Sequence, residues 1–206
     1  MATAQQSLAS LADLSRGVAE WVQSVKQLTQ PDHVYWCAGT DAEIEQLKQQ
    51  MVARGELLTL NEDVFPGCLL ARSDPSDVAR VEHLTFVCTA KPEDAGPNNH
   101  WMDPSEAHRR MRNLFRGCMK GRTLYVVPYC MGPIDSPYSR CGVEITDSPY
   151  VVVNMALMTR MGRPALERIA REGTFVKGLH STGELDPERR FIMHFPEELA
   201  IESYGS

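Results

Sequence analysis

The chain has 206 residues, of which 43% are hydrophobic and 23% are charged, and its formal net charge is −6. These values predict a globular protein with enough apolar material for a sizeable core, and they exclude a mainly disordered chain. No apolar run approaches the roughly 18 residues that a membrane span needs. A mitochondrial presequence would avoid acids, but Asp13 and Glu20 lie near the N-terminus of this chain. We therefore expect a cytoplasmic protein that does not cross a membrane.

The first part of the chain alternates between helical and strand patterns. Apolar residues recur every three or four positions over 8–28, which predicts an amphipathic helix, and a short buried strand is expected at 34–37. Thr40 and Glu43 form the Thr-x-x-Glu pattern of a capping box, so a second helix should begin there and end near Gly55.

Turn, strand and loop signals follow in the middle of the chain. The polar run 72–77 predicts a turn, 81–89 alternates like a strand, and 91–99 is rich in proline, glycine and asparagine, as surface loops are. Asp103 should cap the next helix, and Glu106 should complete another capping box.

The second half continues the same alternation. We expect a loop at 131–142, strands at 124–128, 143–145, 174–180, 191–195 and 199–204, and helices at 149–162 and 164–171. The predicted fold class is α/β, with a mixed sheet and flanking helices.

Six cysteines and six histidines are scattered along the chain, without the C-x-x-C, H-x-x-x-H or H-E-x-x-H spacing of metal or redox sites. We expect free thiols and no metal site. Cys130 follows a predicted strand, but no sequence neighbour supplies the base or positive charge that would lower its pKa, so a packed thiol is favoured over a nucleophile. The triplet 146–148 before Pro149 is interpreted first as a helix cap.

Residues 117–123 have a superficial likeness to a phosphate-binding loop. The two glycines are one residue too close, Arg122 replaces the lysine, and a helix precedes the loop where one should follow it. A connection between a helix and a strand is therefore favoured.

The stretch 107–134 carries six lysines and arginines and no acid. Such a patch can attract nucleic acid or other anions. However, Arg109, Arg112 and Arg116 recur at helical spacing away from the apolar stripe, and Phe115 belongs to that stripe and is not free to stack on bases. A solvated helix face is favoured, and we expect no nucleic-acid binding.

Arg80 follows the predicted turn and opens the strand at 81–89. On a strand, Arg80 and Glu82 project to the same face, and an arginine oriented by a carboxylate forms a fork that suits a substrate carboxylate. The alternative is a structural ion pair at a strand end. From the spacing alone, this structural pair is favoured over a substrate ligand.

Longer strings carry more specific information than these single residues. They are YWC at 35–37, LARSDPSDVARVE at 70–82, AGP at 95–97, WMDP at 101–104, GCMKGRTLYVVPYCMGP at 117–133, GVEITDSPYVVVNMALMTRM at 142–161, FVK at 175–177 and LHS at 179–181. In order and approximate spacing they resemble the N-terminal third of the GTP-dependent phosphoenolpyruvate carboxykinases. Tyr129 and Cys130 depart from the phenylalanine and serine usual in that family, and 184–190 lacks a segment often seen there.

The resemblance implies an enzyme that converts oxaloacetate and GTP to phosphoenolpyruvate, GDP and carbon dioxide in gluconeogenesis, assisted by Mn²⁺ and Mg²⁺. Residues 1–206 would form the N-terminal domain that binds the substrate carboxylate. Arg80 matches the family's carboxylate-binding arginine, so the resemblance favours a substrate ligand over a structural ion pair at this residue. Glu82 matches the acid beside it, which would steady Arg80 and contact the closing lid.

The family's catalytic, nucleotide-binding and metal-binding residues are expected outside this chain, and family members are expected to be monomers. The chain stops at Ser206, directly after a predicted strand, so we expect a truncated enzyme without turnover of its own. The alternative is a natural truncated product that acts as a non-catalytic anion-binding or partner-binding module. RNA binding by the stretch 107–134 is a third interpretation.

Overall fold

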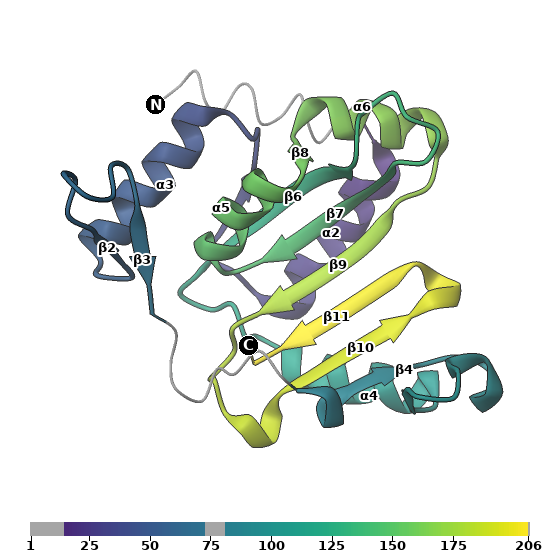
Figure 1. Cartoon of the computed structure of the whole chain (residues 1–206). Helices are drawn as coiled ribbons and strands as arrows, with labels where there is room; N and C mark the ends of the chain where they lie inside the picture. Colours follow the sequence, from purple (N-terminus) through teal and green to yellow (C-terminus); the bar gives the residue numbers. More distant parts are fainter. Residues whose placement is uncertain (1–14, 73–80, 206) are drawn as a thin grey trace.

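The computed structural model describes residues 15–72 and 81–205. Over these residues the chain forms an α/β fold around one mixed sheet of nine strands (Figure 1). Eight strands follow the order β1-β6-β7-β9-β11-β10-β4-β5, and β8 pairs with β6. The strands are β1 (His33–Trp36), β4 (Thr85–Val87), β5 (His100–Trp101), β6 (Thr123–Met131), β7 (Arg140–Thr146), β8 (Arg160–Met161), β9 (Val176–Ser181), β10 (Phe191–Phe195) and β11 (Ala200–Tyr204). The predicted fold class is confirmed.

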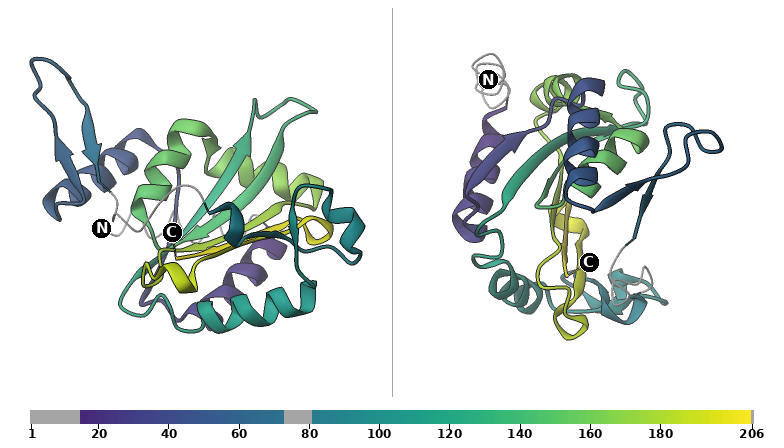
Figure 2. Two further views of the ribbon diagram at one scale, coloured as in Figure 1. Left: turned by 60° about the horizontal axis from the view of Figure 1, so that its bottom comes forward. Right: turned by 90° about the vertical axis from the view of Figure 1, so that its left-hand side faces the viewer.

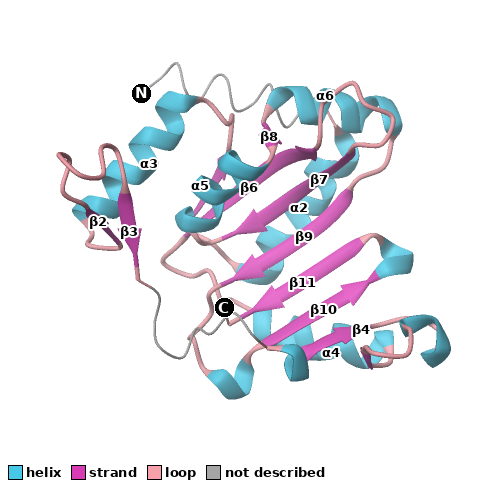
Figure 3. Ribbon diagram, viewed as in Figure 1, coloured by secondary structure: helices cyan, strands magenta, loops and turns pink. Residues whose placement is uncertain are grey.

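Helices flank the sheet on both faces (Figure 3). They are α2 (Arg16–Thr29), α3 (Asp41–Ala53), α4 (Pro104–Phe115), α5 (Pro149–Met158) and α6 (Arg163–Glu172). In Figure 2, α2 and α4 lie on one side of the sheet and α3 and α5 on the other. Short 3-10 turns link several strands: Glu82–Leu84, Pro92–Ala95, Pro187–Arg189 and Pro196–Glu198.

Strand β6 separates two hydrophobic cores. Leu124 and Val126 face the larger core, which α2, α4 and α6 cover, while Tyr125 and Val127 face the smaller core under α3 and α5. A strand buried on both faces has a nearly continuous apolar sequence, as this one has. Each fully buried side chain of this kind stabilises the fold by roughly 1.5–3 kcal/mol relative to an exposed one.

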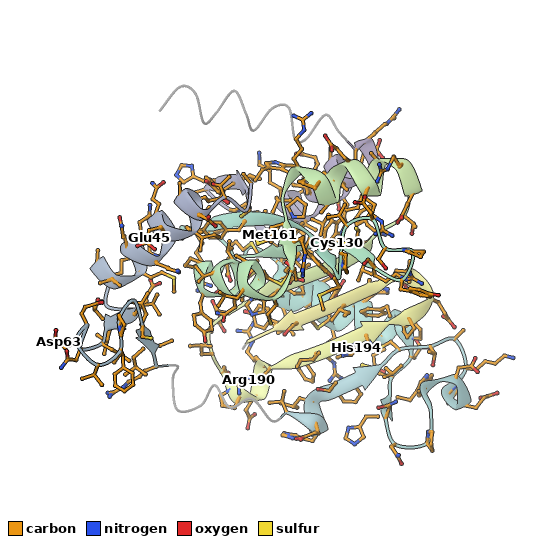
Figure 4. All side chains as sticks on the ribbon, turned by 45° about the horizontal axis from the view of Figure 1, so that its top comes forward. Glu45, Asp63, Cys130, Met161, Arg190 and His194 are labelled. Atoms are coloured by element: carbon orange, nitrogen blue, oxygen red, sulfur yellow. The ribbon has the colours of Figure 1, made fainter. Side chains whose placement is uncertain are left out.

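A separate hairpin of β2 (Leu57–Thr59) and β3 (Leu69–Ala71) projects beside α3 (Figure 1). Asp63 lies at its outer end, away from the sheet (Figure 4). Neither strand was predicted, because three residues are too few to show a regular alternation.

The helix caps form as predicted only in part. The hydroxyl of Thr40 accepts a bond from the Glu43 amide at 3.3 Å, but the Glu43 carboxylate bonds the amides of Ala38 and Gly39 instead of returning to Thr40. At α4 the Asp103 carboxylate bonds two amides of the first turn, whereas Glu106 pairs with Arg110 one turn further on. Each acid therefore bonds a different partner from the one that a capping box supplies.

The predicted strand at 81–89 is wrong over its first residues. Glu82–Leu84 is a 3-10 turn, and the strand β4 begins at Thr85. The turn is closed by the carbonyl of Val81, which accepts bonds from the Leu84 amide and the Thr85 hydroxyl, both at 2.9 Å. Glu82 therefore lies in a turn and not on the expected strand, while Arg80, which was expected on the same strand face, lies outside the described residues.

Two further boundaries differ from the prediction. The helix expected at 149–162 ends at Met158, because the backbone of Thr159 is extended and Arg160–Met161 then pair with β6. The loop expected at 131–142 is shorter, since β6 and β7 continue as a hairpin up to the pair Met131 and Arg140.

Candidate active site

One edge of the sheet collects the carboxyl ends of three neighbouring parallel strands. These strands, β7, β9 and β11, end at Thr146, Ser181 and Tyr204. Strands β6, β10 and β4 run the other way and begin at this edge. In open α/β sheets ligands bind outside the carboxyl ends of the strands, so this edge is the candidate site.

A buried carboxylate holds together the segments that follow β7 and β9 at this edge. Asp147 follows β7, and its side chain is fully buried. It accepts hydrogen bonds from Arg122 Nη1 at 2.7 Å, from the Ser181 hydroxyl at 2.7 Å and from the Thr182 amide at 3.0 Å. Three donors satisfy the desolvated charge, which a buried carboxylate requires.

Arg122 completes this network from the turn before β6. Besides Asp147, its guanidinium donates to the hydroxyl of Thr182 at 3.0 Å and to the carbonyl of Gly183 at 2.9 Å. Arg122 and Asp147 lie 25 positions apart in the chain, and no local pattern predicted their contact. The pair holds the ends of β7 and β9 together and is a positioning element of the site.

The residues after β11 are fixed to the same edge. The Gly205 amide donates to the carbonyl of Ser181 at 2.9 Å, and Arg190 Nε donates to the carbonyl of Gly205 at 2.7 Å. Arg190 lies at the start of β10 (Figure 4). These two bonds fix Gly205 to the edge of the sheet.

Glu82 lies at this edge of the sheet, two strands from Tyr204, in the turn before β4. Its side chain is exposed and lines a cavity of about 300 Å³ together with Thr85, Asn99 and His100. Arg80, the predicted carboxylate ligand, lies outside the described residues. Its role, and that of Glu82 beside it, stay predictions.

Glu144 is a further titratable group, on β7 near this edge. Burial raises the pKa of Glu144 to about 8. It faces Gly178 of β9, where an added Cβ would lie 1.8 Å from Glu144 Oε2, so only glycine leaves room for the carboxyl group. A carboxyl group that titrates near neutral pH can exchange a proton there. Sequence inspection missed it because its environment is made by neighbouring strands.

The other candidates from the sequence lie in structural surroundings. Cys130 is fully buried opposite Cys141 in the β6–β7 hairpin, and burial raises the pKa of Cys141 to about 12. This burial supports the interpretation of Cys130 as a packed thiol. The loop at 117–123 joins α4 to β6, and its amides at Gly117 and Met119 donate to carbonyls at the end of α2. They are not directed at a ligand, as the amides of a phosphate loop would be.

The basic stretch behaves as a helix face. Arg109 and Arg112 on α4 and Arg116 directly after it are exposed, while Met111 and Phe115 are fully buried. Phe115 is therefore not available to stack on a base.

Within residues 15–72 and 81–205, no group of three or more histidine, cysteine, aspartate or glutamate side chains is placed to hold a metal ion. Among the helices of the described part, none is both long and apolar enough to span a bilayer.

Comparison with known proteins identifies the family. Residues 20–206 match the family model described as phosphoenolpyruvate carboxykinase N-terminal domain. The chain belongs to this family. Its α/β sheet with flanking helices agrees with the N-terminal domain of these enzymes.

Three relatives, each named phosphoenolpyruvate carboxykinase (GTP), show how much of such a protein the chain represents. It is 52% identical over 186 residues to the protein of Anaeromyxobacter dehalogenans, which covers 90% of this chain and 31% of the relative. It is 48% identical over 202 residues to the Chlamydia felis protein, covering 92% and 34%. It is 50% identical over 197 residues to the Corynebacterium jeikeium protein, covering 90% and 32%. The chain spans about a third of the length of these relatives.

Proposed function

We propose that this chain is the oxaloacetate-binding part of a GTP-dependent phosphoenolpyruvate carboxykinase, with Arg80 as the ligand of the substrate carboxylate. The observation that carries the proposal is the family match over residues 20–206, together with relatives of that name at about half identity. Arg80 and Glu82 both lie within the matched residues.

The geometry of the sheet edge supports this function. Glu82 is exposed beside a cavity, at the edge where open α/β sheets bind ligands. Arg122 and Asp147 bond each other and the residues that follow β9, so this network positions the edge of the sheet.

The reaction divides into two bond changes. In the first, the carbon–carbon bond to the leaving carboxylate breaks, carbon dioxide departs, and its electron pair remains as an enolate. In the second, the enolate oxygen forms a bond to the γ-phosphorus of GTP while the bond to the bridging oxygen breaks and GDP leaves. Arg80 would hold the retained carboxylate by charge-assisted hydrogen bonds and so fix the orientation of the enolate.

Mn²⁺ and Mg²⁺ would neutralise phosphate charge in the second step. Within residues 15–72 and 81–205 no cluster of ligating side chains is placed to hold such an ion, and we assign the metals to no residue there.

A chimaera tests the proposal. This chain would replace the matching third of the Anaeromyxobacter dehalogenans relative, and phosphoenolpyruvate formation from oxaloacetate and GTP would be measured. We expect turnover from the chimaera and none from the 206-residue chain alone. An inactive but folded chimaera, or turnover by the chain alone, would contradict the proposal.

A further inference from the structure

A groove runs between α2 and α4, on the face of the sheet away from α3 and α5. The two helices lie side by side there (Figure 2). The groove has a volume of about 540 Å³, and it shares no residue with the cavity beside Glu82. Small-molecule sites typically span roughly 300–1,000 Å³. Its size therefore suits a molecule rather than a single ion.

The floor of the groove is apolar. Val25, Phe115 and Leu179 line it, and each is at most 5% exposed. Trp21 of α2 adds an aromatic wall, with its ring 5.8 Å from that of Phe175. A ligand that fills the groove would need an apolar body to replace water on this surface.

The rim of the groove carries positive charge. Arg112 lines it from α4, Arg116 from the residue directly after α4, and Lys177 from β9. Within the described part of the chain, neither Arg116 nor Lys177 lies within 4.0 Å of a carboxylate. By contrast, Arg110 on the same helix pairs with Glu106 at 3.1 Å.

The acids that line the groove already face an internal partner. Glu198 lies 2.8 Å from His108 Nε2, and Glu202 lies 4.0 Å from His108 Nδ1. The His108 ring is in turn held by stacking on Phe195 at 4.1 Å. Both carboxylates are directed at His108, and within the described part of the chain neither forms an ion pair with Arg116 or Lys177, so these two cations are available to a ligand.

We propose that this groove binds an organic anion that joins a flat apolar body to a carboxylate, sulfonate or phosphate group. The body would lie on the apolar floor, and the anionic group would be held by the charges of Arg116 and Lys177. This inference goes beyond the carboxykinase function, because the groove is separate from the carboxyl edge.

Two dyes with nearly the same body and different charge test the ligand class. They are 8-anilinonaphthalene-1-sulfonate and its uncharged analogue N-phenyl-1-naphthylamine, titrated against the 206-residue chain by fluorescence. We expect the sulfonate to bind about tenfold more tightly than the neutral dye, and this advantage to shrink as salt is added. Equal affinities of the two dyes would overturn the proposal.

Charge-removing variants test the location. We expect Arg116→Gln and Lys177→Gln each to weaken binding of the sulfonate about fivefold and to leave binding of the neutral dye unchanged. Arg109→Gln, on the same helix but outside the groove, is the control and should bind like the parent chain. Unchanged sulfonate affinity in both groove variants would show that the dye binds elsewhere and would overturn the proposal.

Discussion

The guanidinium of Arg122 lies 2.7 Å from the carboxylate of Asp147, and this contact joins the turn before β6 to the end of β7. The Asp147 side chain is fully buried, whereas that of Arg122 is 38% exposed. Water can therefore screen the charge of Arg122, whereas the charge of Asp147 is shielded from water. The contribution of this pair to the stability of the fold comes mainly from the buried carboxylate and its other donors, Ser181 and Thr182.

Removing that carboxylate should destabilise the fold. We expect Asp147→Ala to lower the free energy of unfolding by about 2–4 kcal/mol, because Arg122 and the donors from β9 lose a shared acceptor. Urea unfolding of the chain measures this change. Glu20→Ala, which breaks an exposed pair with Arg16, is the control and should have no measurable effect. Equal stabilities of the two variants would show that the network is dispensable.

Glu144 should make stability depend on pH. Burial raises its pKa in the fold to about 8, whereas the unfolded value is about 4.3. The native state therefore binds the proton more tightly, and the resulting stability is fully present below about pH 4.3 and is lost as the pH rises through 8.

Glu144→Gln should remove this dependence. Unfolding by urea at several values between pH 5 and pH 8.5 should show a smaller loss of stability in the variant than in the parent chain. Glu45→Gln, on the exposed side of α3, should keep the parent profile. Parallel profiles for Glu144→Gln and the parent would contradict the raised pKa.

Gly178 should be intolerant of a side chain because of the same carboxyl group. An added Cβ would lie 1.8 Å from Glu144 Oε2, so Gly178→Ala forces the acid out of its place. We expect a loss of about 1–3 kcal/mol, as for overpacked cores, and a smaller loss when Glu144→Ala is also present. A double-mutant cycle measures this coupling. Additive effects of the two changes would show that the residues do not compete for space.

Elements with a strong local signal were predicted well from the sequence. The strand β10 has the predicted bounds, Phe191–Phe195, and α4 begins after Asp103 as expected. In both cases the deciding information lies within a few neighbouring residues, as the alternation of a strand or the cap of a helix.

Features that depend on distant contacts were not predictable in the same way. The run 81–89 has strand-like alternation, but the Val81 carbonyl closes a 3-10 turn before β4 can begin. The pairing of Arg160–Met161 with β6 ends α5 early, and it needs a strand from elsewhere in the chain. The Arg122–Asp147 pair and the surroundings of the half-buried Glu144 likewise exist only because the sheet brings β6, β7 and β9 together.

Arg80 is proposed to bind the carboxylate of oxaloacetate, and steady-state kinetics of the chimaera provide the decisive measurement. Arg80→Ala should raise KM for oxaloacetate by about tenfold or more and lower kcat/KM, because a charge-assisted hydrogen bond contributes roughly 1.5–3 kcal/mol. Arg72→Ala, an exposed arginine of the same segment, is the control and should leave both constants unchanged. An Arg80→Ala chimaera with the parent KM and kcat would contradict the account.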